Sequence, residues 1–79
     1  MLTRYIRAAL HHARYRPLDD GTFFAEIPGF EGVWANAPDL ESCREELEDV
    51  LEEWILVRVS RHLALPTVDG LELKVSEVA

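Results

Sequence analysis

The architecture of this protein can be predicted from residues 39–63, which read DLESCREELEDVLEEWILVRVSRHL. Apolar side chains recur there every three or four residues, a spacing that places them along one side of an α-helix. This apolar stripe consists of Leu40, Cys43, Leu47, Val50, Leu51, Trp54 and Ile55. Asp39 stands just before the stripe and is a residue type that commonly caps a helix N-terminus. The pattern therefore predicts one long amphipathic helix over residues 39–63.

The other faces of this predicted helix are strongly acidic. Within residues 41–53, Arg44 is accompanied by the carboxylates of Glu41, Glu45, Glu46, Glu48, Asp49, Glu52 and Glu53. Residues 1–16, in contrast, carry arginines and no acid. A concentrated negative surface attracts a positively charged partner. We expect the partner-binding residues to be Glu45, Glu48, Asp49 and Glu52, the alternative being a solvated face that only keeps the protein in solution.

Residues 13–36 are predicted to form a three-stranded antiparallel meander. Its middle strand covers 23–28, where successive side chains alternate between an apolar face and a second face. Pro17 lacks the amide donor that a central strand needs, so the strand containing it is expected at an edge of the sheet. Between these two strands, Gly21 can adopt the positive φ of a hairpin turn.

Two shorter elements complete the predicted fold. Apolar side chains at helical spacing predict a helix over residues 3–12, with Thr3 as its N-cap. Alternating leucine, valine and polar residues predict a final strand over 71–76. Residues 1–79 thus form a single α+β domain in which the meander packs on the long helix.

Composition limits the class of protein. A chain of 79 residues with 48% hydrophobic residues is an ordinary folded domain, but it buries only about 60% of its unfolded surface, which favours a homodimer or a higher homo-oligomer. The net charge of −7 opposes autonomous nucleic-acid binding. One cysteine cannot form an intrachain disulfide, and no apolar run reaches the roughly 20 residues of a membrane span. We therefore expect a cytoplasmic protein that is not inserted in a membrane.

Three segments in this order resemble the HicB-like antitoxin family. They are GTFFAEIPGFEGVWA at residues 21–35, DLESCREEL at 39–47 and LEEW at 51–54. Together they supply a two-strand hairpin, a third strand flanked by aromatic residues, and a helix that opens on Leu-Glu-x-Cys. The resemblance covers roughly residues 4–73.

The resemblance implies a partial RNase H-like fold and a function in a toxin-antitoxin system. The implied partner is HicA, a small basic toxin that degrades messenger RNA, and the antitoxin inhibits it by occlusion. Fuller members of the family often add a DNA-binding segment that residues 1–79 do not contain, which puts direct autorepression in doubt. The alternative is a stand-alone homo-oligomeric binding protein without a toxin, in which an exposed strand pairs with a second copy.

An enzymatic function is a further alternative to this binding function. A partial RNase H-like fold suggests two-metal hydrolysis by Asp19, Asp20, Glu26 or Asp39. Two of these residues lie in the predicted hairpin turn and one is the predicted helix cap, so these three have a structural explanation. We expect no catalytic activity.

Other residue types that often carry chemistry have structural explanations as well. Cys43 is a candidate nucleophile or redox sensor, but it falls on the apolar stripe, where cysteine packs as a small hydrophobe. His11 and His12 would point about 100° apart on a helix and so would not share a metal ion. Trp34 and Trp54 are either a binding platform or core residues, and we expect at least one of them in the core. We expect neither a metal site nor a cofactor.

Overall fold

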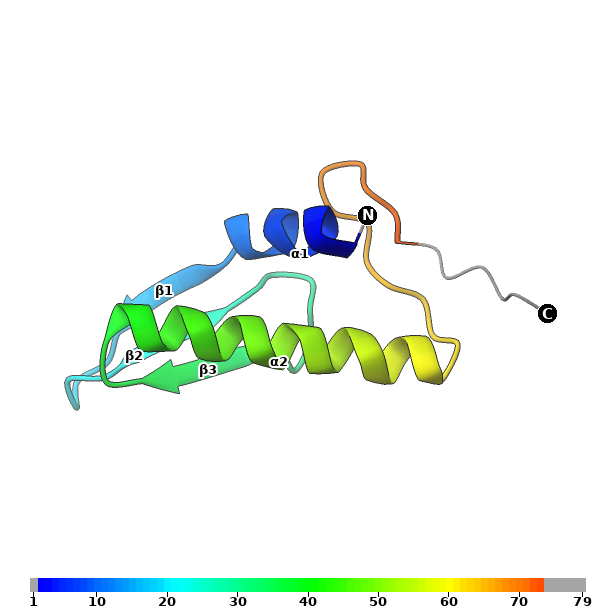
Figure 1. Ribbon diagram of the computed structural model, residues 1–79. Helices are drawn as coiled ribbons and strands as arrows, with labels where there is room; N and C mark the ends of the chain where they lie inside the picture. Colours follow the sequence, from blue (N-terminus) through cyan, green and yellow to red (C-terminus); the bar gives the residue numbers. More distant parts are fainter. Residues whose placement is uncertain (1, 74–79) are drawn as a thin grey trace.

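The computed structural model describes residues 2–73. Along the chain, one helix precedes and one helix follows three consecutive strands (Figure 1). The elements are helix α1 (Leu2–His11), strands β1 (Arg14–Pro17), β2 (Phe23–Glu26) and β3 (Trp34–Ala37), and helix α2 (Leu40–Ser60). The strands form one antiparallel sheet in the order β1-β2-β3. The predicted α+β class, a three-stranded meander packed on one long helix, is confirmed.

Helix α2 begins at the predicted cap. The Asp39 backbone is extended, with φ −140°, and its carboxylate accepts a hydrogen bond of 2.7 Å from the Ser42 amide and one of 3.0 Å from the Ser42 hydroxyl. The helix ends at Ser60, three residues before the predicted end. His62 takes a left-handed conformation there, with φ 57°, and the Leu63 amide donates back to the Arg58 carbonyl at 2.8 Å. This Schellman-type closure prevents the helix from continuing.

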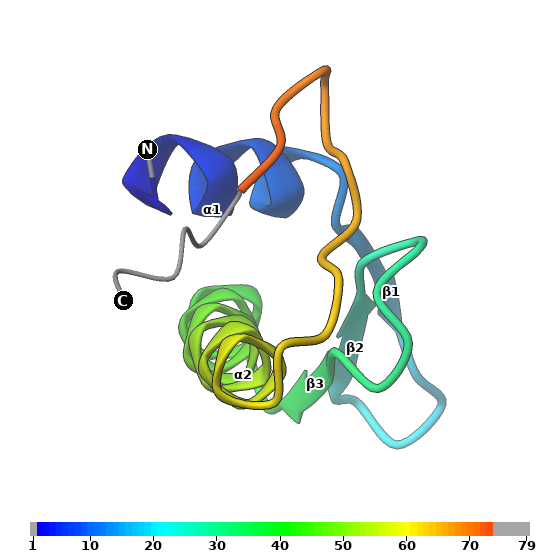
Figure 2. The same cartoon turned by 90° about the vertical axis from the view of Figure 1, so that its right-hand side faces the viewer.

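The core lies between α2 and one face of the sheet, and α1 lies beside α2 (Figure 2). The sheet contributes small side chains at its centre, because Ala25, Ala35 and Ala37 all point toward α2 and are buried. Larger apolar residues fill the rest of this core: Tyr5, Ile27, Phe30, Val33, Leu47, Leu51, Ile55 and Val68. The helix can therefore approach the sheet closely at its N-terminal end.

The strand register separates the two faces of the sheet as predicted. Ala25 pairs with Ala35 on the face under α2, whereas Phe24 and Trp34 lie on the opposite face. Strand β1, with Pro17, is at an edge, and Gly21 has φ 86° in the hairpin turn. Both of these predictions are confirmed.

Three details differ from the prediction. Thr3 lies inside α1 rather than at its cap, because the helix already begins at Leu2. The third strand reaches Ala37, whose side chain is buried under α2. Leu40, in the first turn of α2, was expected on the apolar stripe but is half-exposed.

After α2, the chain returns toward α1. The Tyr5 hydroxyl donates to the Pro66 carbonyl, and His12 Nε2 lies within hydrogen-bond distance of the Asp69 carboxylate, at 2.7 Å. Asp69 and Gly70 both have positive φ, and this two-residue turn joins an antiparallel bridge between Val68 and Leu71. Of the predicted strand over 71–76, the structure shows this bridge at Leu71, and residues 74–76 lie outside the described part of the chain.

The cap of α2 can be tested by substitution. We expect Asp39→Ala to lower the free energy of unfolding by about 1 kcal/mol, because it removes the acceptor for the first-turn amide. Urea unfolding followed by circular dichroism measures the change. Asp49→Ala is the matched control, since this exposed carboxylate accepts no hydrogen bond among residues 2–73. Equal destabilisation by the two substitutions would contradict the capping role.

Candidate functional site

The four predicted partner-binding residues lie on the exposed surface of α2. Glu45, Glu48, Asp49 and Glu52 are three or four residues apart, so they share the side of the helix that turns away from the sheet. Within residues 2–73, none of these carboxylates takes part in an ion pair or a side-chain hydrogen bond. Their charges are therefore not neutralised by basic groups in direct contact.

The four residues divide into two pairs. Glu48 and Glu52 border a groove of about 410 Å³ between α1 and α2, which we call the interhelical groove. Glu45 and Asp49 do not line it and face solvent. The groove has an apolar floor and charged rims of both signs, formed by Thr3, Ile6, Arg7, Leu10, His11, Arg44, Glu48 and Glu52.

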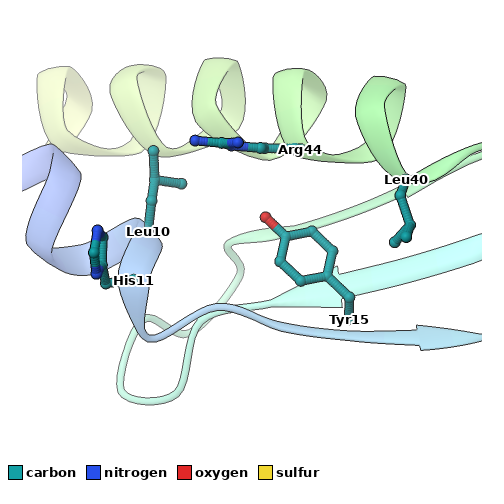
Figure 3. A pocket seen from close by; sticks show the side chains of 5 residues that line it. All are labelled: Leu10, His11, Tyr15, Leu40 and Arg44. Atoms are coloured by element: carbon teal, nitrogen blue, oxygen red, sulfur yellow. The ribbon is translucent and has the colours of Figure 1, made fainter.

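One end of the interhelical groove opens into a smaller hollow of about 310 Å³, shown in Figure 3. Leu10, His11 and Arg44 line both spaces, while Tyr15 and Leu40 close the far end. In Figure 3 the Tyr15 ring rises from β1 toward α2, between Leu10 and Leu40. Partial burial raises the pKa of Tyr15 and the nearby Arg44 guanidinium opposes this rise, so the hydroxyl remains neutral and able to donate a hydrogen bond. The hollow can accommodate an apolar side chain that carries a hydrogen-bond acceptor.

The acidic side of α2 ends in exposed apolar residues that the sequence analysis missed. Leu56 follows Glu52 by one helical turn and is 66% exposed, and Val57 and Leu63 are also exposed. We call Leu56, Val57 and Leu63 the apolar tip. The signal was present in residues 54–57, which read WILV, because four consecutive apolar residues cannot all lie on one helix face.

Comparisons with known proteins place the chain in a family. The sequence model of the UPF0150-like family matches residues 4–66. The chain belongs to this family. It is also similar to the crystal structure of TTHA0281 from Thermus thermophilus, with 34% sequence identity, a TM-score of 0.90, and coverage of 96% of this chain and 95% of that one. No curated protein gives a significant match.

The two tryptophans of this UPF0150-like protein have different environments. Trp54 packs against Phe30 with ring centroids 5.1 Å apart, and its indole nitrogen donates a 3.0 Å hydrogen bond to the Glu31 carbonyl. The Arg58 guanidinium covers this indole at 4.8 Å from its centroid. Trp34, in contrast, lies on the uncovered face of the sheet and is 55% exposed. The prediction that at least one tryptophan anchors the core is met by Trp54.

The carboxylates considered for two-metal hydrolysis occupy separate places. Asp20 accepts hydrogen bonds from the amide and hydroxyl of Thr22, which lowers the pKa of its carboxyl, and Asp39 caps α2. Glu26 lies on the uncovered sheet face. In the part of the chain that the structure describes, no three His, Cys, Asp or Glu side chains are grouped closely enough to hold a metal ion. Neither α1 nor α2 has the length and apolar content to cross a bilayer.

Cys43, in the first turns of α2, is fully buried between this helix and the sheet. Its sulfur lies 3.5 Å from the Phe23 carbonyl oxygen and 3.8 Å from that of Ala35. Burial, assisted by the nearby Glu46 carboxylate, raises the pKa of the Cys43 thiol. These surroundings suit a packed core residue and disfavour the thiolate that a nucleophile or redox sensor requires.

The reactivity of Cys43 tests this assignment. At neutral pH we expect an aromatic disulfide reagent to modify the native thiol about 100-fold or more slowly than the unfolded chain, because modification requires opening of the core. Absorbance of the released thiolate gives both rates. A Glu45→Cys substitution in a Cys43→Ala background places the thiol on the exposed side of α2 and should react rapidly. Native Cys43 reacting as fast as this control would identify an accessible thiol.

Proposed function

We propose that this UPF0150-like protein is a HicB-like antitoxin module that neutralises a small basic HicA-type toxin by covering its RNA-binding surface. The observation that carries the proposal is the set of four carboxylates on the exposed side of α2, none of which forms an ion pair within residues 2–73. The partner acts on messenger RNA, so the complex would form in the cytoplasm. A buried cysteine without an intrachain partner is compatible with that reducing compartment.

Electrostatics explains why such a surface would inhibit a ribonuclease. A protein that binds RNA presents positive charge to the phosphates. From Glu45 to Glu52, the acidic side of α2 extends roughly 10 Å along the helix axis, which suits a single basic patch. The carboxylates would occupy the positions of phosphates on that patch, and the toxin would lose access to RNA.

Charge alone gives rapid encounter but limited affinity. Tight protein complexes usually depend on a few apolar or aromatic groups that become fully buried at the centre of the interface. Two such places adjoin the carboxylates here: the apolar tip after Glu52, and the hollow beside Tyr15 at the end of the interhelical groove. An interface that includes either would combine steering by charge with apolar burial.

Charge reversal on α2 tests the proposed partner surface. We expect Glu48→Lys/Asp49→Lys to weaken binding of a purified HicA-type toxin at least tenfold and to restore its cleavage of messenger RNA, because both side chains would then repel the basic patch. Titration calorimetry measures the affinity, and gel analysis measures cleavage. Asp19→Lys is the control, since it reverses the charge of one carboxylate on the exposed hairpin, away from α2. Affinity of the unmodified chain should also fall with added salt.

Two results would contradict the antitoxin proposal. One is unchanged toxin binding by the α2 double variant. The other is co-expression with the product of the neighbouring open reading frame that recovers self-associated chain alone and gives no relief of toxicity. The second result would favour the stand-alone homo-oligomeric binding protein.

The proposal requires no catalytic step by this chain. We expect the purified protein to leave RNA intact in the presence of Mg²⁺ or Mn²⁺, because the candidate carboxylates lie apart and are explained by the turn, the helix cap and the sheet. Denaturing gel electrophoresis of labelled RNA checks this. Metal-dependent cleavage that disappears in Glu26→Gln would show a nuclease.

A further inference from the structure

Arg44 is the single basic residue within the acidic stretch of α2 at residues 41–53. Glu41 stands three positions before it and Glu48 four positions after it, which are the spacings at which helical ion pairs form. Among residues 2–73, however, Arg44 takes part in no ion pair and no side-chain hydrogen bond. Its side chain instead borders both the interhelical groove and the smaller hollow at the end of that groove. The cation is therefore available to an added anion.

The hollow gathers hydrogen-bond donors on an apolar lining. In Figure 3 the Tyr15 hydroxyl points toward the Arg44 side chain, and His11 lies at the α1 end. This hydroxyl makes no hydrogen bond within the part of the chain that the structure describes. The other lining residues, Leu10 and Leu40, are apolar, and none of these described lining residues is acidic. A space of about 310 Å³ with this lining suits an anion carried on an apolar stem.

We propose that this hollow binds a glutamate of the partner protein, whose carboxylate is held by Arg44 and Tyr15. The inference rests on the proposed function, because the partner is the same basic toxin that covers the acidic side of α2. The Arg44 guanidinium pairs with the carboxylate through two parallel hydrogen bonds, and the Tyr15 hydroxyl donates a third. The methylene groups of the glutamate lie between Leu10 and Leu40.

The charges beside the hollow favour a single acidic residue within a basic surface. Glu48 and Glu52 follow Arg44 along the same groove at intervals of one helical turn, about 6 Å each. The partner surface that fits is therefore acidic at one end and basic over the next two turns. A nucleic acid does not fit, because its phosphates repeat along the chain and the next ones meet Glu48 and Glu52. A uniformly acidic peptide is repelled in the same way.

This order of charges makes the chain selective among basic proteins. A wholly basic surface is attracted by the carboxylates of α2, but it places a cation against Arg44, and this repulsion lowers its affinity. A toxin with a glutamate at that position gains a charge-assisted pair instead. Its own basic residues neutralise Glu48 and Glu52, so these carboxylates do not repel its glutamate. Arg44 is thus the residue that distinguishes the toxin from other basic proteins.

Removal of the Arg44 charge tests the inference, because net charge and the proposed pair predict opposite changes in affinity. If α2 attracted the toxin only through its negative charge, Arg44→Gln would strengthen binding. The proposed pair predicts that Arg44→Gln weakens binding of the toxin encoded by the neighbouring open reading frame about tenfold, and Tyr15→Phe about threefold. Titration calorimetry measures both affinities.

Arg4→Gln is the matched control. It removes the same charge from an exposed position of α1 that does not line the interhelical groove, so it should not weaken toxin binding. Circular dichroism verifies that all three variants are folded.

Substitutions in the toxin identify the residue that faces Arg44. Each exposed glutamate of the toxin is replaced in turn by glutamine. One of these replacements should weaken binding to the unmodified chain about tenfold and leave binding to Arg44→Gln unchanged, because the pair is already lost in that variant. Failure of every toxin glutamate to show this coupling would overturn the glutamate site.

The outcomes separate this inference from the antitoxin proposal. Weaker binding by Glu48→Lys/Asp49→Lys, together with unchanged or tighter binding by Arg44→Gln, would overturn the glutamate site and leave the antitoxin proposal standing. A toxin that does not bind the unmodified chain would overturn both.

Discussion

The close packing of α2 on three alanines of the sheet controls where the charged groups of this protein point. Cys43 and Leu47 are completely buried against the sheet, and the Cys43 sulfur touches backbone carbonyls. A larger residue at Ala35 would push the helix away from β3, because protein interiors have little free volume. With the helix so fixed, its rotation is set, and the acidic residues must face outward. Among residues 2–73, no helix packs on the other face of the sheet.

The protein consequently has two chemically different surfaces on opposite sides. The α2 side is acidic and ends in the apolar tip, whereas the uncovered sheet face displays an aromatic stack with arginines and one glutamate. A surface dominated by one sign of charge favours a partner protein of the opposite charge. The proposed antitoxin function uses the α2 side and does not involve the uncovered sheet face.

The secondary structure could be predicted because it depends on local periodicity. The three- and four-residue spacing of apolar residues identified α2, alternation identified β2, and Asp39 and Pro17 marked a cap and an edge. The exposed positions of the acids followed from the same spacing. The end of α2 was missed because the left-handed residue is His62, whereas glycine is the usual signal at that position. The apolar tip was missed because only the apolar residues at stripe positions were considered, and Leu56 and Val57 lie on other faces of the helix.

The interhelical groove could not have been predicted, because its width depends on contacts between residues far apart in the sequence. Helix α1 is held by the hydrogen bond from Tyr5 to the Pro66 carbonyl and by the side-chain contact between His12 and Asp69. The segment after α2 contains both partners, Pro66 and Asp69. Its first residues are fixed to the helix by the hydrogen bond from the Arg58 side chain to the Ala64 carbonyl. Each of these contacts joins groups whose sequence neighbours give no indication of pairing. Arg58 also covers the indole of Trp54, which packs against the core. The packing of α2 on the sheet therefore influences the position of α1. The position of α1 in turn sets the shape of the groove beside Glu48 and Glu52.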